Sequence, residues 1–304
     1  MKSWGLCFVL VAALISGIAN FFNKQAINTV GDSFVLTTTK NVLVALILCL
    51  TFLLPKIWRE ARKLTRKQWG LLAAIGLVGG SLPFVLFFKG LALTSAIQAS
   101  FIHKTLFIWA TILAVVLLKE KVARLQLGAL VVLLGGNILL DGFNNWHFGW
   151  PGLLILLATL LWSCEYIIAK FVLRNVSSWL VAWARMFFGA IVLVVWLIFT
   201  GKTSAVASLG GLQWAWIGAS AVLLFGYVMT WYAALRREPV SVVASVLVLA
   251  SPITTLISGV ATGKFGLRQL AGAVIIGFAV ILIWNLKRRE QKFLFPTVSD
   301  NKVF

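Results

Sequence analysis

Acidic side chains are scarce in this chain of 304 residues. It contains 8 Asp and Glu against 27 Lys and Arg, which gives a formal net charge of +19. In a soluble protein this excess would suggest nucleic-acid binding, but here the cations lie between long apolar runs. Apolar residues make up 61% of the chain and charged residues 12%, against roughly 45–50% and 25% in soluble domains. The composition excludes a soluble enzyme, a disordered chain and a DNA-binding module, and it indicates an integral membrane protein.

Residues that build metal, disulfide and nucleotide sites are also few. The three cysteines lie singly within apolar runs, and the two histidines, His103 and His147, are far apart and lack a CxxC or HExxH context. The chain has no GxxxxGK[ST] sequence and therefore no P-loop ATP site. We predict no metal, no cofactor and no ATPase site in this chain.

Ten apolar stretches reach the length of about 20 residues that a helix needs to cross a bilayer. They cover roughly 4–23, 34–54, 69–88, 93–117, 124–140, 150–169, 179–199, 212–232, 240–262 and 268–286. The segments between them are short. The sequence therefore predicts an all-α integral membrane protein with ten transmembrane helices.

The distribution of Lys and Arg predicts the orientation in the membrane. An even number of spans places both termini on the same side. If that side is cytoplasmic, 19 of the 27 cations lie in cytoplasmic segments, 5 lie outside and three lie within spans. Cytoplasmic loops carry such an excess of Lys and Arg. We therefore predict cytoplasmic termini, and the positive charge requires no nucleic-acid partner, although it also favours anionic lipid headgroups.

The chain contains an internal repeat. Residues 91–139 overlay residues 235–283 without gaps at an offset of 144, and Thr111 falls on Thr255. Each half holds five spans, and an odd number of spans forces the halves into opposite orientations. Inverted repeats are typical of secondary transporters, whose substrate site lies at the repeat interface. The predicted units are a first five-helix repeat, a second inverted five-helix repeat and a cytoplasmic tail, at 1–142, 147–290 and 291–304.

Sequence motifs at the span junctions point to a family. The residues from Leu118 to Ala129 (LKEKVARLQLGA) resemble the GE…QxxGA junction of the EamA-type members of the drug/metabolite transporter superfamily, and GLALTSA from Gly90 precedes span 4. The second half has a weaker copy, with Lys264 where the family usually has Glu. The resemblance covers nearly the whole chain. It implies a plasma-membrane carrier, often an exporter of amino acids or related metabolites, that works by alternating access without ATP.

Ionisable side chains within the spans are candidates for the transport site, because charges in hydrocarbon are usually paired or functional. Glu165 and Arg185 bracket the loop between spans 6 and 7, and Asn20 and Lys40 bracket the loop between spans 1 and 2 in the same way. The two pairs are repeat mates, offset by 145 residues. Two interpretations of Glu165 and Arg185 stay open and are compatible: an ion pair that locks the hairpin, and a polar site or gate that faces the central cavity.

Span 4 places His103 and Lys104 close to the midplane of the membrane, with Gln98 nearer to its start. A lysine at that depth needs a carboxylate, helix-end carbonyls, water or an anionic ligand. The spans hold three cations and one anion, and this excess favours an anionic or carboxylate-bearing solute. Two deep tryptophans complete the set of predicted cavity residues, which are Asn20, Lys40, Gln98, His103, Lys104, Trp109, Trp162, Glu165 and Arg185.

Two prolines interrupt predicted spans. Pro83 follows two glycines in span 3, and Pro252 lies in the middle of span 9. Proline frees a backbone carbonyl and permits a kink in a membrane helix. We therefore predict hinges at both positions.

These features predict a multi-pass secondary transporter of the plasma (inner) membrane, a monomer or homodimer, that exports amino acids or other carboxylate-bearing metabolites. The alternative is an antiporter of lipophilic cations and protons that uses Glu165, because a glutamate in the first helix has that role in the small multidrug members of the superfamily; Asn20 occupies the mate position in the first half. A membrane enzyme would need paired carboxylates, a metal cluster or a Ser/His arrangement at one depth. The sequence offers none, so we predict no catalytic residues.

Overall fold

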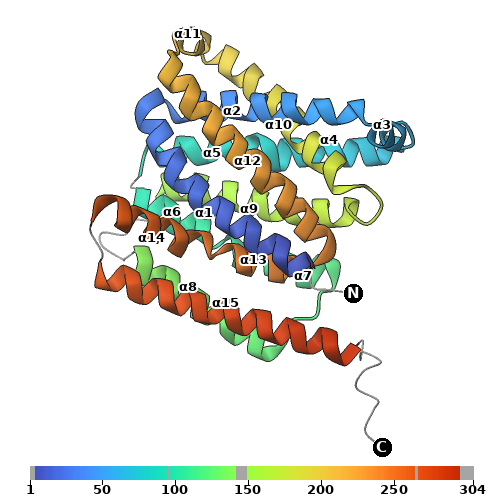
Figure 1. Cartoon of the computed structure of the whole chain (residues 1–304), viewed down its shortest axis with the longest axis vertical. Helices are drawn as coiled ribbons and strands as arrows, with labels where there is room; N and C mark the ends of the chain where they lie inside the picture. The colour runs from blue at the N-terminus through green and yellow to red at the C-terminus, as the bar shows by residue number, and fades with distance from the viewer. Residues whose placement is uncertain (1–3, 95, 142–148, 264–265, 295–304) are drawn as a thin grey trace, which may run out of the picture.

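A computed structural model describes residues 4–94, 96–141, 149–263 and 266–294, and these ranges are helical throughout, with short turns (Figure 1). The first half contains α1 (Trp4–Val30), α2 (Ser33–Cys49), the 3-10 helix η1 (Leu50–Leu53), α3 (Pro55–Arg62), α4 (Arg66–Gly80), α5 (Leu82–Leu91), α6 (Ala96–Lys104), α7 (Leu106–Leu118) and α8 (Arg124–Asp141). The second half contains α9 (Trp150–Val172), α10 (Ser178–Phe199), α11 (Thr203–Ala207), α12 (Gly211–Arg237), α13 (Val240–Leu247), α14 (Ala250–Thr262) and α15 (Leu267–Leu294).

The described helices confirm the all-helical membrane fold. Nine segments are long and apolar enough to cross a bilayer, and a tenth, Arg124–Leu140, is apolar but shorter. The side of the membrane on which the termini lie stays a prediction. Most of the predicted tail 291–304 lies outside the described residues.

Three of the predicted spans are divided into two helices each. The breaks fall at Ser81 between α4 and α5, at Thr105 between α6 and α7, and at Val248–Leu249 between α13 and α14. Pro83 and Pro252 each lie in the first turn of the helix that follows a break, where a missing N–H is tolerated. The break at Thr105 has no proline, and it lies 144 residues before Leu249, which is the offset of the sequence repeat.

The helix α3 was not predicted, because its segment is too polar to read as a span. Pro55 fixes the first helical residue, and Ile57 and Ala61, four residues apart, are buried while the basic side chains of the helix are exposed. It therefore lies across the end of the bundle as a short amphipathic helix.

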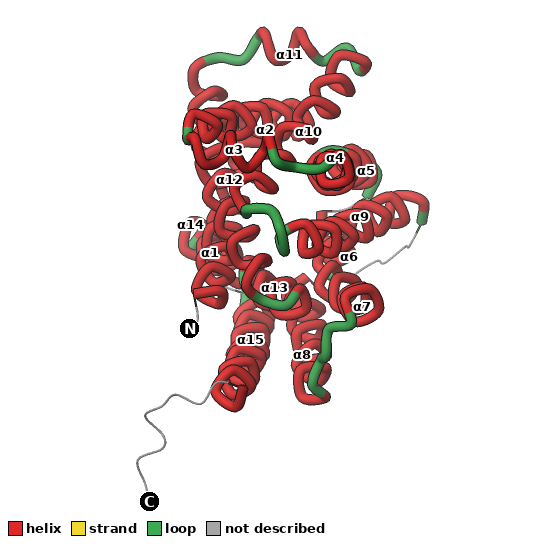
Figure 2. The backbone as a smooth tube through the Cα atoms, turned by 90° about the vertical axis from the view of Figure 1, so that its right-hand side faces the viewer, coloured by secondary structure: helices red, strands yellow, loops and turns green. Residues whose placement is uncertain are grey.

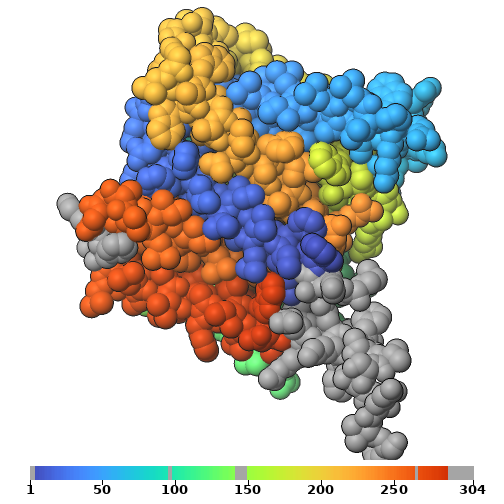
Figure 3. Space-filling model, viewed as in Figure 1, coloured from blue at the N-terminus to red at the C-terminus, as the bar shows by residue number. Residues whose placement is uncertain are grey.

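The two halves interlock. The most extensive helix contacts join one half to the other: α1 packs on α12, α4 on α10, α5 on α9, and α8 on α15. Figure 1 shows α1 lying along α12, with α8 and α15 as a pair at one edge, and the turned view in Figure 2 shows the same pair side by side. The space-filling view shows the blue N-terminal and orange C-terminal segments forming one continuous face (Figure 3).

Glycine allows the closest of these approaches, between α4 and α10. A Cβ built on Gly80 would lie 2.5 Å from the carbonyl oxygen of Arg185 and 3.0 Å from the Cα of Gly189. Real Cβ atoms do not come so close to a backbone. Small residues of this kind let membrane helices pack backbone to backbone.

We expect Gly80→Ala to destabilise the protein by about 1–3 kcal/mol, because the added methyl group forces α4 and α10 apart. The matched control is Gly70→Ala on the same helix, where a Cβ meets nothing within 4 Å. It should leave stability unchanged or raise it by about 0.4–1 kcal/mol. Thermal unfolding of the purified proteins in detergent measures both, and equal melting temperatures would contradict the close α4–α10 contact.

Candidate functional site: a polar cavity between the repeats

A cavity of about 640 Å³ lies between the two halves, and helices of both halves line it. The lining residues of α1 and α2 come from the part near the turn that joins these helices, Ser16 to Ile27 and Leu36 to Asn41. Those of α6 run from Ala99 to Lys104. The cavity therefore occupies the middle of the bundle and the end that carries the α1–α2 turn, away from the start of α1.

Seven of the nine predicted cavity residues line this space: Asn20, Lys40, His103, Lys104, Trp162, Glu165 and Arg185. The structure places the other two elsewhere. Gln98 accepts a hydrogen bond from the Thr94 hydroxyl at 2.9 Å, and the Trp109 indole donates to the Thr105 hydroxyl at 3.1 Å. The periodicity of one helix could not show which of its sides faces the cavity.

Several polar lining residues were not predicted from the sequence: Asn23, Asn41, Ser220, Tyr227 and Trp231. They are uncharged, so a search for ionisable groups passes over them. Two asparagines deep in apolar spans were the available signal.

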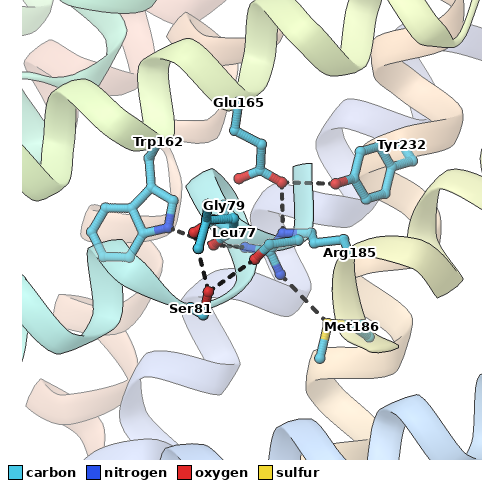
Figure 4. Close-up of polar contacts among 9 residues, drawn as sticks. Leu77, Gly79, Ser81, Trp162, Glu165, Arg185, Met186 and Tyr232 are labelled. Atoms are coloured by element: carbon cyan, nitrogen blue, oxygen red, sulfur yellow. Dashed lines mark hydrogen bonds and ion pairs between the residues drawn. The ribbon is translucent and has the colours of Figure 1, made fainter. Parts of the chain in front are cut away.

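Glu165 and Arg185 form a buried ion pair. Arg185 Nε lies 2.6 Å from Glu165 Oε1, and the Tyr232 hydroxyl donates to the same oxygen at 2.7 Å (Figure 4). The two charged residues are 1% and 6% exposed. A Cβ on Gly79 of α4 would overlap the Glu165 carboxylate, so the missing side chain there is what lets the carboxylate reach this position.

The carbonyl of Gly79 connects this pair to the break in span 3. Its helical hydrogen-bond donor would be the N–H four residues on, and Pro83 has none. The carbonyl instead accepts from Arg185 Nη2 at 3.1 Å and from the Trp162 indole at 3.0 Å (Figure 4). Helices α4, α9, α10 and α12 therefore meet in one hydrogen-bonded unit, as the locking interpretation requires.

Lys40 is a buried cation of the cavity wall whose hydrogen-bond partner is uncharged. Its Nζ donates to Asn23 Oδ1 at 3.1 Å, and the residue is 9% exposed. No carboxylate in the described part of the chain pairs with it. Asn20, its repeat partner in the prediction, lines the same cavity, but the hydrogen bond goes to the asparagine one turn further along α1.

Four buried polar atoms on residues of the cavity wall have no hydrogen-bond partner among the described residues. They are Asn41 Oδ1, His103 Nδ1, Ser220 Oγ and Trp231 Nε1. Buried polar atoms are nearly always hydrogen-bonded to protein, water or ligand. The wall of the cavity therefore carries polar groups that the described side chains do not satisfy.

Aromatic rings form a cluster in the same wall. The His103 ring lies 4.7 Å from the Trp162 ring and 5.4 Å from the Phe87 ring, and Phe84 packs edge-on against Trp162 at 5.2 Å. The cavity wall therefore combines aromatic rings with buried polar groups.

On the side of the bundle away from the α1–α2 turn, partly buried polar contacts join α13 to the first repeat and α9 to the end of α12. The Glu120 carboxylate accepts hydrogen bonds from the N–H groups of Val240 and Ser241, at 2.7 and 3.1 Å, and from the Ser241 hydroxyl at 2.9 Å. It thus caps the N-terminus of α13, where a negative charge is favourable. Lys170 donates to the carbonyl of Leu235 at 2.7 Å, a carbonyl that lacks its helical donor because the residue four positions on is Pro239.

At the opposite end, Lys202 forms an ion pair with Asp32, which caps α2. Partial burial favours the neutral form of this carboxyl group, but hydrogen bonds from Lys202 and from the N–H groups of Val35 and Phe34 outweigh it and lower the pKa of Asp32. This contact is partly exposed and is weaker for that reason. The Lys202–Asp32 contact at this end is therefore expected to be weaker than the Glu120 contacts with α13 at the other end.

Two interlocked five-span units around a polar cavity, with broken helices beside it, define a membrane transporter of small solutes. Comparison with known proteins agrees. The model of the EamA-like transporter family matches residues 3–140 and 149–285, so the chain belongs to the EamA-like transporter family, part of the drug/metabolite transporter superfamily.

A solved crystal structure shares the fold, with a TM-score of 0.79 over 95% of this chain and 99% of its own, at 17% sequence identity. No curated protein sequence matches the chain significantly. The family and the shared fold thus identify the architecture and the general activity, and they leave the solute to be argued from the cavity.

We expect Arg185→Met to lower the free energy of unfolding by about 3–5 kcal/mol, because it leaves Glu165 buried without its partner. The double variant Glu165→Gln, Arg185→Met removes both charges and should recover most of that loss. The control is Arg174→Met. Arg174 is an exposed cation just after α9, and its replacement should change stability by less than about 0.5 kcal/mol. Unfolding in detergent measures all three; a double variant no more stable than the single one would show that the pair is not a structural lock.

Proposed function

We propose that this transporter carries a carboxylate-bearing metabolite, an amino acid or a related organic acid, and that Lys40 binds the carboxylate. The observation that supports the proposal is the buried Lys40 ammonium, which has an asparagine oxygen as its partner and no carboxylate in the described part of the chain. An uncompensated cation in a low-dielectric site is costly, and an anionic solute supplies the missing charge.

The ion pair strengthens this argument. Glu165 is the one acidic residue in the interior of a predicted span, and Arg185 neutralises it at 2.6 Å. The cavity therefore keeps a positive charge on Lys40, whose hydrogen-bond partner is the neutral Asn23.

The alternative, an antiporter of lipophilic cations and protons, needs Glu165 to release and take up its counter-ion during transport. Its carboxylate accepts from both Arg185 and Tyr232 and is 1% exposed. A cation that entered this cavity would have to displace a guanidinium from a site shaped by Gly79. The arrangement therefore favours the carboxylate carrier.

We further propose export across the plasma (inner) membrane by alternating access, with both termini in the cytoplasm. The direction of transport and the choice of membrane rest on the family resemblance. The orientation of the termini rests on the distribution of Lys and Arg. Alternating access requires contacts between the repeats to open on the side of the cavity away from the α1–α2 turn, and the Glu120 cap on α13 is one such contact.

We expect carboxylate-bearing metabolites to raise the melting temperature of the purified protein, and Lys40→Met to abolish the shift. A ligand at 100 times its dissociation constant stabilises the folded state by about 2.7 kcal/mol if it binds that state alone. Amino acids, organic acids, nucleosides and lipophilic cations form the screening set. Lys104→Met should weaken the shift as well, since Lys104 lines the same cavity.

The control is Lys89→Met, which removes an exposed cation from α5 and should leave the shift intact. A shift produced by lipophilic cations alone, and lost in Glu165→Gln, would overturn the carboxylate proposal in favour of the antiporter. A shift retained in Lys40→Met would place the carboxylate elsewhere in the cavity.

In Glu120→Ala, α13 loses the cap on its N-terminus. We therefore expect the cavity to open more often on the side away from the α1–α2 turn. Ser245 on α13 is fully buried, so Ser245→Cys in a variant without Cys7, Cys49 and Cys164 reports access through its rate of thiol labelling. The cap is worth about 0.5–2 kcal/mol, which corresponds to a labelling rate several-fold higher. Glu120→Asp should restore slow labelling in part, and an unchanged rate in Glu120→Ala would show that the cap does not hold the cavity closed.

A further inference from the structure

A second pocket lies outside the central cavity, at the end of the bundle where α1 begins. Its volume is about 540 Å³, and its walls come from the end of α2, from α3, and from the starts of α4 and α10. The residues that matter here are Cys49, Phe52, Trp58, Arg62, Trp69 and Trp183. None of them takes part in the proposed transport site.

Aromatic rings form most of this pocket. The Trp183 ring lies 4.7 Å from the Phe52 ring and 6.1 Å from the Trp69 ring, both edge-on. The Trp183 indole N–H donates to Cys49 Sγ at 3.3 Å, so its polar atom is satisfied within the protein. Trp58 stands at the mouth of the pocket, 52% exposed and 6.1 Å from Phe52. The floor is therefore apolar and suits a hydrocarbon chain.

Basic side chains are concentrated in and beside α3, which forms one wall of the pocket and contributes Arg62 to it. Six exposed cations lie within twelve residues: Lys56, Arg59, Arg62, Lys63, Arg66 and Lys67. The one acidic residue among them, Glu60, accepts a hydrogen bond from the N–H of Ser177 at 2.6 Å, which directs its charge inward to the start of α10. The segment 56–67, which includes α3, thus carries an excess of positive charge beside the aromatic pocket.

The position of the pocket matches the boundary of a bilayer. Leu53 and Leu54, which connect α2 to α3, are 79% and 54% exposed, as expected of side chains that face lipid. Tryptophan prefers this interfacial depth, and four to eight Lys and Arg next to a membrane helix attract anionic lipids. The apolar pocket, the neighbouring cations and the position at the membrane boundary all fit a molecule with an acyl chain and an anionic headgroup.

We propose that this pocket binds an anionic phospholipid of the surrounding bilayer, with an acyl chain against Phe52, Trp58 and Trp183 and the phosphate between Arg59 and Arg62. The bound lipid joins α3 to α10, the helix that carries Arg185 two residues after Trp183. It is separate from the transported solute and its site.

Quenching of tryptophan fluorescence tests the proposal on the full chain. The protein is placed in phosphatidylcholine nanodiscs that contain the same low fraction of either phosphatidylglycerol or phosphatidylcholine with brominated acyl chains. We expect brominated phosphatidylglycerol to quench more strongly. Trp58→Phe should remove most of this excess, because Trp58 is the ring at the mouth. Arg59→Gln, Arg62→Gln should raise the half-quenching fraction roughly 30-fold, a factor of about five for each basic side chain.

Lys119→Gln, Lys121→Gln is the matched control, since it removes two exposed cations between α7 and α8 and should keep the excess quenching. Arg59→Lys, Arg62→Lys keeps the charge and should keep most of the preference, which separates lost binding from misfolding. Equal quenching by the two lipids would overturn the proposal, and so would an excess that persists in Arg59→Gln, Arg62→Gln. Competition by soluble glycerol phosphate would overturn it too, because recognition would then need no membrane lipid.

Discussion

The buried ion pair between Glu165 and Arg185 is the interaction on which the rest of the structure depends. Two charges in the middle of a membrane bundle are tolerated because each is hydrogen-bonded as well as paired: Tyr232 donates to the carboxylate, and the guanidinium donates to the Gly79 carbonyl. That carbonyl is available because Pro83 cannot donate to it. One proline thus breaks span 3 and supplies the acceptor that anchors α10.

The same pair determines the electrostatics of the cavity. Because Arg185 pairs with Glu165, the acidic residue inside a predicted span, Lys40 has the amide oxygen of Asn23 as its hydrogen-bond acceptor, at 3.1 Å. Under the proposed function, the solute supplies the negative charge that Lys40 lacks in its own surroundings.

Much of the fold could be predicted from the sequence because bilayer physics is simple. The length and apolar composition of the spans predicted a helical membrane bundle with two five-span repeats. Glu165 and Arg185 are equally spaced about one loop, and this spacing predicted that they lie close together. The breaks were only half predictable. Proline marks those at Ser81 and Leu249, whereas the break at Thr105 follows from the repeat alone.

The site was harder to predict for a physical reason. Inside an apolar helix every position looks alike, so the side of α6 or α7 that faces the cavity depends on packing against other helices, and Gln98 and Trp109 were misplaced relative to it. Uncharged residues such as Ser220 and Trp231 gave no signal of their own. The amphipathic helix α3 was hidden because span searches reject charge, although its charge is what suggests a lipid site.

The central claim is that a buried, uncompensated cation selects a carboxylate. The most direct test is titration calorimetry of the wild-type protein with the best-binding carboxylate metabolite and with its carboxamide, which keeps the shape and removes the charge. The account predicts that the carboxylate binds at least about 10-fold more tightly, the equivalent of about 1.4 kcal/mol. Equal affinity for the two compounds would show that Lys40 does not read the charge of the solute, and it would contradict the account.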